Sequence, residues 1–176
     1  KACELNPGTM AAIIGLADEK VVEVCEQVTK SGKRVVAASF NCPGQLVISG
    51  SKEGIDEACE LLKEAGAKRA LPLKVGGAFH SPFMQSAKDE LQAGIEATNI
   101  ASPKCAVYQN VDAKPHTDAA EIKANLIAQA DHPVRWIACV NTMRDFGADT
   151  YVECGPGKTL AGFNKRIDKT LRSLNV

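Results

Sequence analysis

The first 75 residues alternate between short apolar runs and longer segments with helical periodicity. Thr9–Leu16 is a continuous apolar run, which predicts a buried strand. Asp18 opens a segment whose valines recur at helical spacing until Ser31 and Gly32 end it. Three more strands are predicted at 35–40, 45–49 and 69–75, and a second helix at 54–65. The order β-α-β-β-α-β over residues 9–75 is that of a ferredoxin-like subdomain.

After residue 80 the pattern changes to helices separated by two short strands. Helices are predicted at 82–99, at 118–130, from Pro133 onward and through Ile167, a polar loop at 109–117, and strands at 105–108 and 150–154, the latter buried. This alternation indicates an α/β layer, but two strands are too few for an independent sheet. We therefore expect residues 76–176 to belong to a larger domain. The start at Lys1, without an initiator Met, favours a piece of a longer protein.

Composition and charge narrow the class of protein. The 21 basic and 21 acidic side chains cancel, which argues against a dedicated nucleic-acid-binding protein. No apolar run approaches the roughly 20 residues of a membrane span, and no secretory signal opens the chain. The seven cysteines show neither Cys-x-x-Cys nor zinc-finger spacing. We expect reduced thiols, no metal site and a cytoplasmic protein without nucleic-acid or membrane partners.

His80 is the leading candidate for chemistry. It follows an apolar strand and the pair Gly76-Gly77 and precedes a predicted helix, and such loops hold reactive side chains rigidly yet accessibly. Histidine also titrates near neutral pH, which suits proton transfer. The alternative is a buried histidine satisfied by a backbone carbonyl. The glycines favour the functional interpretation because they permit close approach of a ligand. His116 and His132 are predicted to be surface loop residues.

No nucleophile motif accompanies this histidine. The Gly-x-Ser-x-Gly elbow is absent, Ser81 is expected to point away from its neighbour, and nothing near Cys42 would lower a thiol pKa. The segment 155–159 (GPGKT) invites a phosphate-loop interpretation, but Val152 stands where that motif needs glycine. We predict a tight strand-to-helix turn there, whose exposed amides could face an anion.

Six segments, in this order and spacing, resemble the malonyl-CoA:acyl-carrier-protein transacylase family and the acyltransferase domains of polyketide synthases. They are Met10–Leu16, Asn41–Gly50, Ala67–Leu73, Gly77–Met84, Pro133–Trp136 and Glu153–Gly157. The resemblance covers nearly the whole chain. It implies an α/β-hydrolase-like domain with a small ferredoxin-like insertion. Residues 9–75 would be the insertion and 76–176 the C-terminal portion of the large domain. The serine elbow, the oxyanion loop and the malonyl-binding arginine would precede Lys1.

The resemblance also implies roles for individual residues near the reacting groups. His80 matches the general base of the family, which takes the serine proton and returns one to the leaving thiol. Gln129 matches the glutamine whose carbonyl orients that histidine in place of a carboxylate. Phe79 matches the aromatic residue of malonyl-selective members, where a bulky ring would clash with a methyl branch.

Five further residues match positions around the family's cleft. Asn41 matches a loop residue that faces the cleft. Lys68 and Arg69 match positions near the phosphates of coenzyme A. Lys165 and Arg166 match basic residues that meet the acidic carrier protein. The sequence by itself shows only that Lys68-Arg69 and Lys165-Arg166 are two pairs of adjacent basic residues.

On this resemblance the parent enzyme moves a malonyl group from coenzyme A to acyl carrier protein through a serine ester, for fatty-acid synthesis. It needs no metal or bound cofactor, and its partners are malonyl-CoA, the carrier protein and the N-terminal half of the same enzyme. The chain supplies the base but not the nucleophile, so by itself we expect it to be inactive. The alternatives are a non-enzymatic ferredoxin-like ligand- or protein-binding module with a closed core, and a serine hydrolase relative. The enzyme interpretation instead predicts an exposed apolar surface.

Overall fold

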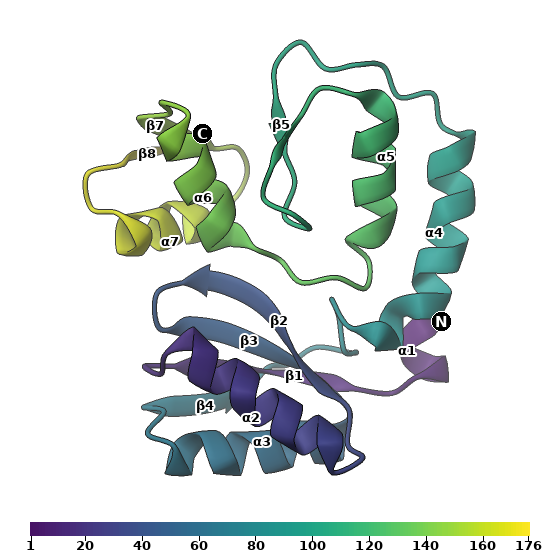
Figure 1. The fold of residues 1–176 in the computed structure, drawn as a ribbon, viewed down its shortest axis with the longest axis vertical. Helices are drawn as coiled ribbons and strands as arrows, with labels where there is room; N and C mark the ends of the chain where they lie inside the picture. The colour runs from purple at the N-terminus through teal and green to yellow at the C-terminus, as the bar shows by residue number, and fades with distance from the viewer.

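The computed structural model describes residues 1–176 and contains a four-stranded sheet unit beside a mainly helical part (Figure 1). In chain order its elements are α1 (Ala2–Leu5), β1 (Thr9–Ile14), α2 (Asp18–Lys30), β2 (Val35–Cys42), β3 (Gln45–Gly50), α3 (Lys52–Glu64), β4 (Arg69–Pro72), the 3₁₀ helix η1 (Pro82–Met84), α4 (Gln85–Ala97), β5 (Val107–Tyr108), β6 (Pro115–His116), α5 (Ala119–Ala128), α6 (Trp136–Asp145), β7 (Thr150–Glu153), α7 (Thr159–Ile167) and β8 (Arg172–Asn175). Each helix and strand predicted from the sequence is present, whereas β6 and β8 are absent from the prediction.

The sheet unit is antiparallel, with the strand order β2-β3-β1-β4. Helices α2 and α3 pack against one face (Figure 1), and the main core between them includes Ile13, Val21, Ile48 and Leu62. The predicted β-α-β-β-α-β order is therefore confirmed. Pro72 ends β4, which is an edge strand, where a residue without an N–H is tolerated. The chain has a mixed α/β fold.

The segment between α5 and α6 joins the helical part to the sheet. The amide of Val134 donates to the carbonyl of Ala38 at 2.9 Å, and the amide of Phe40 donates back to Val134 at 2.8 Å. Val134 thus extends the sheet beyond its edge strand β2 by one bridge. The helix predicted from Pro133 begins only at Trp136, because these two bonds require an extended backbone at Val134.

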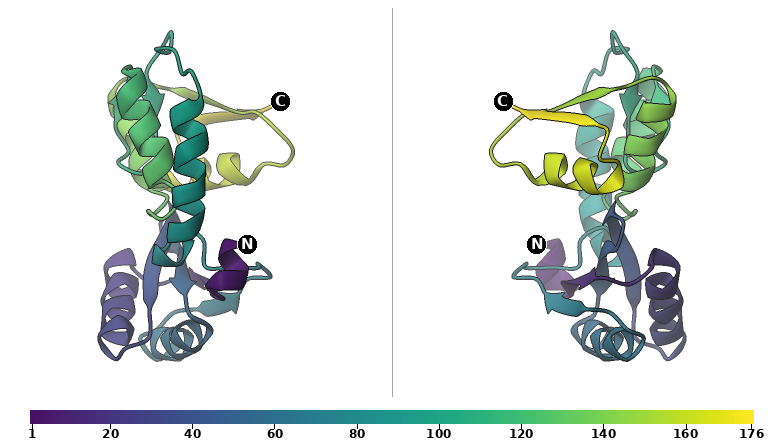
Figure 2. Two further views of the ribbon diagram at one scale, coloured as in Figure 1. Left: turned by 90° about the vertical axis from the view of Figure 1, so that its right-hand side faces the viewer. Right: turned by 90° about the vertical axis from the view of Figure 1, so that its left-hand side faces the viewer.

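The helical part carries two small sheets and little closed core. Strands β5 and β6 pair antiparallel, and β7 and β8 pair parallel. Figure 2 shows the β7–β8 pair projecting away from helices α4, α5 and α6. Alternate residues of both strands face outward, with Val152 50% exposed and Leu174 41% exposed. The expected burial of the strand at 150–154 is therefore wrong, because nothing covers its outer face. No helix has the length and apolarity that crossing a membrane requires.

The close pairing of β2 and β3 can be tested with two glycine substitutions. A Cβ at Gly50 would lie 2.2 Å from the Arg34 carbonyl oxygen and 2.8 Å from the Val35 Cα, whereas one at Gly94 in α4 would meet nothing within 4 Å. Gly50→Ala should lower the free energy of unfolding in urea by about 1–3 kcal/mol. Gly94→Ala should raise it by about 0.5–1 kcal/mol. A Gly50→Ala protein as stable as the wild type would contradict this strand register.

Candidate active site

The loop between β4 and η1 holds His80 in a defined and unusual backbone conformation. His80 has φ +54°, in the left-handed region that residues other than glycine rarely adopt. Its neighbour Ser81 is buried, donates its hydroxyl to the Ala78 carbonyl at 2.6 Å and accepts from the Phe83 amide at 3.3 Å. Such a conformation costs about 1–3 kcal/mol and persists only where the surroundings impose it. Phe79, next to the histidine, is 37% exposed.

The glycines before His80 serve the packing of the chain itself. A Cβ on Gly77 would lie 2.3 Å from the sulfur of Cys3, so α1 occupies the space that the missing side chain leaves. A Cβ on Gly76 would meet nothing within 4 Å. The expectation that both glycines admit a ligand is therefore wrong for Gly77, where a segment of the same chain makes the close approach.

The imidazole of His80 contacts the C-terminal end of α5. Its Nδ1 lies 3.2 Å from the backbone carbonyl oxygen of Gln129, the residue that caps this helix. Because a carbonyl oxygen only accepts hydrogen bonds, this contact assigns the proton to Nδ1 and leaves a lone pair on Nε2. The ring is half-buried. His80 can therefore accept a proton through Nε2 while its orientation is fixed from the other side.

The side chain of Gln129 has a separate role from its backbone. Its Nε2 donates to the carbonyls of His132 and Pro133, at 3.0 and 3.3 Å, and so shapes the turn that follows α5. Asp131 in this turn pairs with Lys88 of α4 at 3.1 Å. Burial raises the pKa of Asp131, but the hydrogen bonds from His132 and Lys88 outweigh it and lower that pKa overall. His132 is exposed, as predicted.

Lys68 and Arg69 lie beside the C-terminal end of β1. A Cβ on Gly15 would lie 2.6 Å from Lys68 Cγ, and Arg69 opens β4 opposite Ile14. Both basic side chains are exposed. Asn41 is half-buried near the end of β2, close to the hairpin that hydrogen-bonds the same end of β1. These three predicted residues therefore share one region.

His80 lies toward the opposite end of β1. Ala78 packs against the residue before this strand, since a Cβ on Gly8 would lie 2.6 Å from Ala78 Cβ. From Gly8 to Gly15 the largely extended chain advances by seven residue steps, which corresponds to roughly 23 Å. The predicted site residues thus form two groups, one around His80 and one around the far end of β1.

Arg166 on α7 is engaged within the chain. Its guanidinium donates to Gln45 Oε1 at 2.6 Å and to the Pro43 carbonyl at 3.1 Å, so it ties α7 to the tip of the β2–β3 hairpin. Lys165 beside it is exposed. The structure therefore gives Arg166 a bridging role that its position on a predicted helix did not reveal.

The turn between β7 and α7 has no free helix N-terminus for an anion. The carboxylate of Glu153 accepts from the amides of Leu160 and Ala161 at 3.1 and 2.9 Å. These backbone hydrogen bonds lower the pKa of Glu153. The carboxylate of Glu153 thus occupies the first amides of α7, while the expectation that the amides of the turn itself could face an anion stays a prediction.

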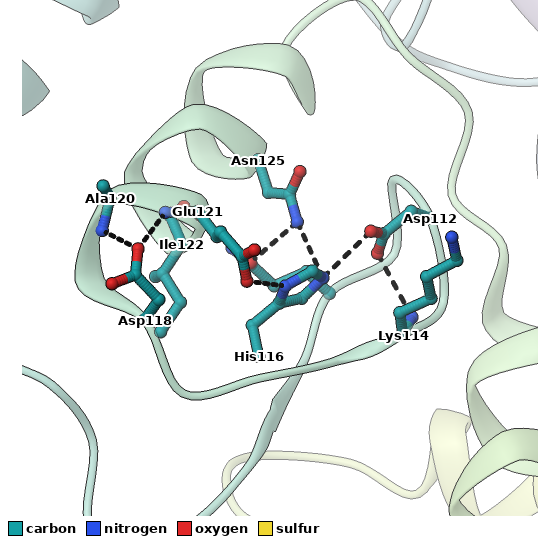
Figure 3. A network of polar contacts seen from close by, with 9 residues as sticks. Asp112, Lys114, His116, Asp118, Ala120, Glu121, Ile122 and Asn125 are labelled. Carbon is teal, nitrogen blue, oxygen red and sulfur yellow. Dashed lines mark hydrogen bonds and ion pairs between the residues drawn. The ribbon is translucent and has the colours of Figure 1, made fainter.

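The prediction for His116 is also wrong. Its side chain is 11% exposed and lies between Asp112 and Glu121, beside Asn125, rather than at the surface (Figure 3). The local sequence looked like a polar loop because its partners are themselves polar. Their convergence on one ring requires the β5–β6 hairpin and α5 to pack together.

All seven cysteines are free, and four of them are buried. Burial raises the pKa of Cys25 to about 12 and that of Cys139 to about 11, and it also raises the pKa of Cys42. The Arg166 charge lowers the pKa of Cys42, contrary to expectation, but burial outweighs it, and the side chain has no exposed surface with which to act as a nucleophile. No group of three or more His, Cys, Asp or Glu side chains is arranged to hold a metal ion.

Comparison with known proteins defines the class to which this geometry belongs. The family model described as acyl transferase domain matches residues 3–175. The chain therefore belongs to the acyl transferase domain family, as the resemblance predicted.

The names of individual relatives indicate a narrower class of acyl transferase than the family model does. A protein of Bacillus subtilis (strain 168) named malonyl CoA-acyl carrier protein transacylase is 42% identical over 176 residues, which is 100% of this chain and 56% of that protein. A Haemophilus influenzae protein of the same name is 43% identical over 96% of this chain and 54% of its own length. The chain spans about half the length of the curated relatives it matches.

Solved structures agree with these relatives. An acyl-carrier-protein S-malonyltransferase from Burkholderia pseudomallei 1710b superposes with a TM-score of 0.93 at 45% identity, over 97% of this chain and 55% of that one. A malonyl-transacylase in complex with its type II PKS acyl-carrier protein gives a TM-score of 0.94 at 39% identity, over 99% of this chain and 57% of that one.

The cap of α7 provides a test by pH. Because the folded-state pKa of Glu153 is lowered, its contribution to stability is fully present above about pH 4.5 and is lost as the pH falls through that lowered value. Glu153→Gln should therefore lower the melting temperature at pH 7 and narrow the difference from wild type as the solution is acidified. Glu60→Gln, on the exposed surface of α3, is the matched control. Equal melting temperatures of Glu153→Gln and wild type at pH 7 would remove the proposed cap.

Proposed function

We propose that the protein carrying this chain transfers a malonyl group from malonyl-CoA to an acyl carrier protein through a serine ester, with His80 as the general base. The observation that supports this most directly is the 3.2 Å contact between His80 Nδ1 and the Gln129 carbonyl, which leaves Nε2 able to accept a proton. Membership of the acyl transferase domain family and the names of the relatives support the class of reaction.

The proposed reaction has two half-reactions that use the same proton acceptor. In the first, Nε2 takes the proton of a serine hydroxyl, the oxygen attacks the thioester carbonyl, and coenzyme A leaves as a thiol with that proton. In the second, Nε2 takes the proton of the carrier thiol, whose sulfur attacks the serine ester, and the serine hydroxyl is regenerated. Both steps are acyl transfers between thiol and hydroxyl, so the proposal includes no metal or bound cofactor.

The nucleophile in this proposal comes from the remaining part of the parent enzyme. We infer that residues 9–75 are a ferredoxin-like subdomain and that 76–176 complete a larger α/β-hydrolase-like domain with the N-terminal half. The strand order of the sheet unit and the uncovered face of β7 and β8 support this division. A binding module with a closed core would instead bury Val152, Leu174 and Val176, which are 41–77% exposed.

The second group of predicted residues fits the other end of an extended thioester. Coenzyme A is long, and its phosphates are anions, so exposed Lys68 and Arg69 at the far end of β1 suit them while the acyl end reaches His80. Asn41 would border the same cleft. Lys165 is the better candidate for the carrier protein, because Arg166 is already bonded to the β2–β3 hairpin. The free thiols support a cytoplasmic location.

Replacing His80 and replacing the side chain of Gln129 should slow formation of the malonyl-serine ester to different extents. His80→Ala in the complete protein should slow formation of the malonyl-serine ester by about 10²- to 10⁴-fold, since it removes general-base catalysis. Gln129→Ala keeps the backbone carbonyl that contacts His80 and should slow the reaction much less. Mass spectrometry of the acylated protein after rapid mixing with malonyl-CoA measures both rates. Near-normal ester formation in folded His80→Ala would exclude His80 as the base.

The aromatic neighbour of the base should set selectivity. Phe79→Ser should admit methylmalonyl groups, because the smaller side chain removes the clash with a methyl branch. Competition between malonyl-CoA and methylmalonyl-CoA, followed as the ratio of the two acylated masses, measures the change. Phe146→Ser, at a phenylalanine that is 72% exposed, is the matched control and should leave the ratio unchanged. An unchanged ratio in Phe79→Ser would mean that other residues define the acyl pocket.

A further inference from the structure

His116 is held by carboxylates on both sides of its ring. Nδ1 lies 3.0 Å from Glu121 Oε2 on α5, and Nε2 lies 2.9 Å from Asp112 Oδ2 in the loop before β6 (Figure 3). The side chain of His116 is only 11% exposed. One ring thus connects the loop and the helix through two polar contacts.

These contacts favour the imidazolium form. Both ring nitrogens face carboxylate oxygens, which only accept, so both bonds form only when both nitrogens carry protons. The hydrogen bond with Glu121 raises the pKa of His116, burial lowers it, and Asp112 raises it further, so that the pKa is raised overall. Asp112 and Glu121 are the charged groups that face the ring, and the nearby Asp118 carboxylate accepts from the first amides of α5.

The amide of Asn125 offers an alternative partner for the same ring. Its Nδ2 lies 3.1 Å from Gln109 Oε1 and 3.0 Å from His116 Nε2. When Nε2 is protonated it donates to Asp112, and the Asn125 amide donates to Gln109. When Nε2 loses its proton it can accept from Asn125, and its lone pair then faces the Asp112 carboxylate without a bond. The cluster therefore has two arrangements that differ by one proton.

The loop before β6 fixes both ends of the segment that supports the candidate base. Gln109 Nε2 donates to the Ile122 carbonyl of α5 at 3.1 Å, and the Arg135 amide at the start of α6 donates to the Asn110 carbonyl at 3.1 Å. Between these two anchors runs the turn that begins at Gln129, whose carbonyl contacts His80.

We propose that His116 is a positioning residue for His80: its imidazolium clamps the loop 109–116 to α5 and so holds the Gln129 carbonyl in place. This inference rests on the proposed function only where it concerns reaction rates. The clamp itself and the orientation of His80 are properties of the chain that can be measured without turnover.

The pH dependence of the clamp has a defined sign. Because the pKa of His116 is raised in the folded protein, the clamp stabilises fully below the ordinary histidine pKa of about 6.5. That stabilisation is lost as the pH rises through the raised folded value. The clamp is therefore strongest below about pH 6.5 and weakens only as the pH passes the raised pKa of His116.

Imidazole NMR of the complete protein tests the clamp directly. In wild type, His116 should titrate above pH 6.5, and neutral His80 should be protonated on Nδ1. His116→Gln and Asp112→Asn should each reduce the population of that His80 tautomer at pH 6.5, and the double variant should reduce it no further than the stronger single change. Lys104→Gln, at an exposed site that also loses one positive charge, should leave it unchanged. A His80 tautomer population that is the same in all variants would overturn the positioning role.

Rates add a second criterion. Malonyl transfer by His116→Gln should be about three- to tenfold slower than wild type near pH 6. The difference should shrink as the pH rises through the raised pKa of His116, where the wild-type clamp opens. If the ratio of the His116→Gln rate to the wild-type rate is the same at every pH, the substitution causes a general packing defect, and the inference is overturned. If wild type transfers no malonyl group, the proposed function fails, and the NMR experiment alone decides the clamp.

Discussion

The hydrogen bond between His80 and the Gln129 carbonyl is the contact on which the candidate site depends. It joins two residues 49 positions apart in the chain and determines which ring nitrogen is free. It also explains why the left-handed backbone at His80 is tolerated, since the buried Ser81 and the end of α5 hold the loop from both sides. Without this contact, none of the hydrogen bonds found in the chain would favour one tautomer of the His80 imidazole.

Contacts from several parts of the fold hold the helical part against the sheet and fix the turn after α5. Val134 is paired with the edge of the sheet, Lys88 of α4 pairs with Asp131, and Arg166 ties α7 to the β2–β3 hairpin. Few apolar side chains of the helical part are fully buried. Polar contacts such as these therefore hold its turns in place. The turn that presents the Gln129 carbonyl is thus held in part by residues distant from His80 in the sequence.

Local pattern predicted the sheet unit well because each of its elements has a clear apolar face. The helices α2 and α3 bury one stripe each, and the predicted helix at 54–65 differs from the observed α3 mainly in its start, because the Ser51 hydroxyl accepts from the Gly54 amide and caps the helix earlier. The pattern of apolar residues predicted the wrong local structure where pairing with a distant strand determines the backbone conformation. Val134 lies on an apolar stripe that predicts helix but is extended because it bonds to β2, and the short strand β8 forms only because β7 lies beside it. The His116 cluster was missed because the partners of this ring lie on two different elements.

A backbone carbonyl is a physically reasonable support for a base that must release its proton as readily as it accepts it. A carboxylate in that position would stabilise the imidazolium strongly, whereas a neutral carbonyl orients the ring and stabilises the charge less. In a transfer between hydroxyl and thiol, the same nitrogen would accept and donate a proton in each half-reaction, so a fixed ring orientation would serve both directions. The carboxylates in this part of the chain are used elsewhere: Asp131 binds Lys88 and His132, and Asp112 faces His116. In this part of the chain the hydrogen-bond partner of His80 Nδ1 is therefore a neutral carbonyl, while these carboxylates pair with other side chains.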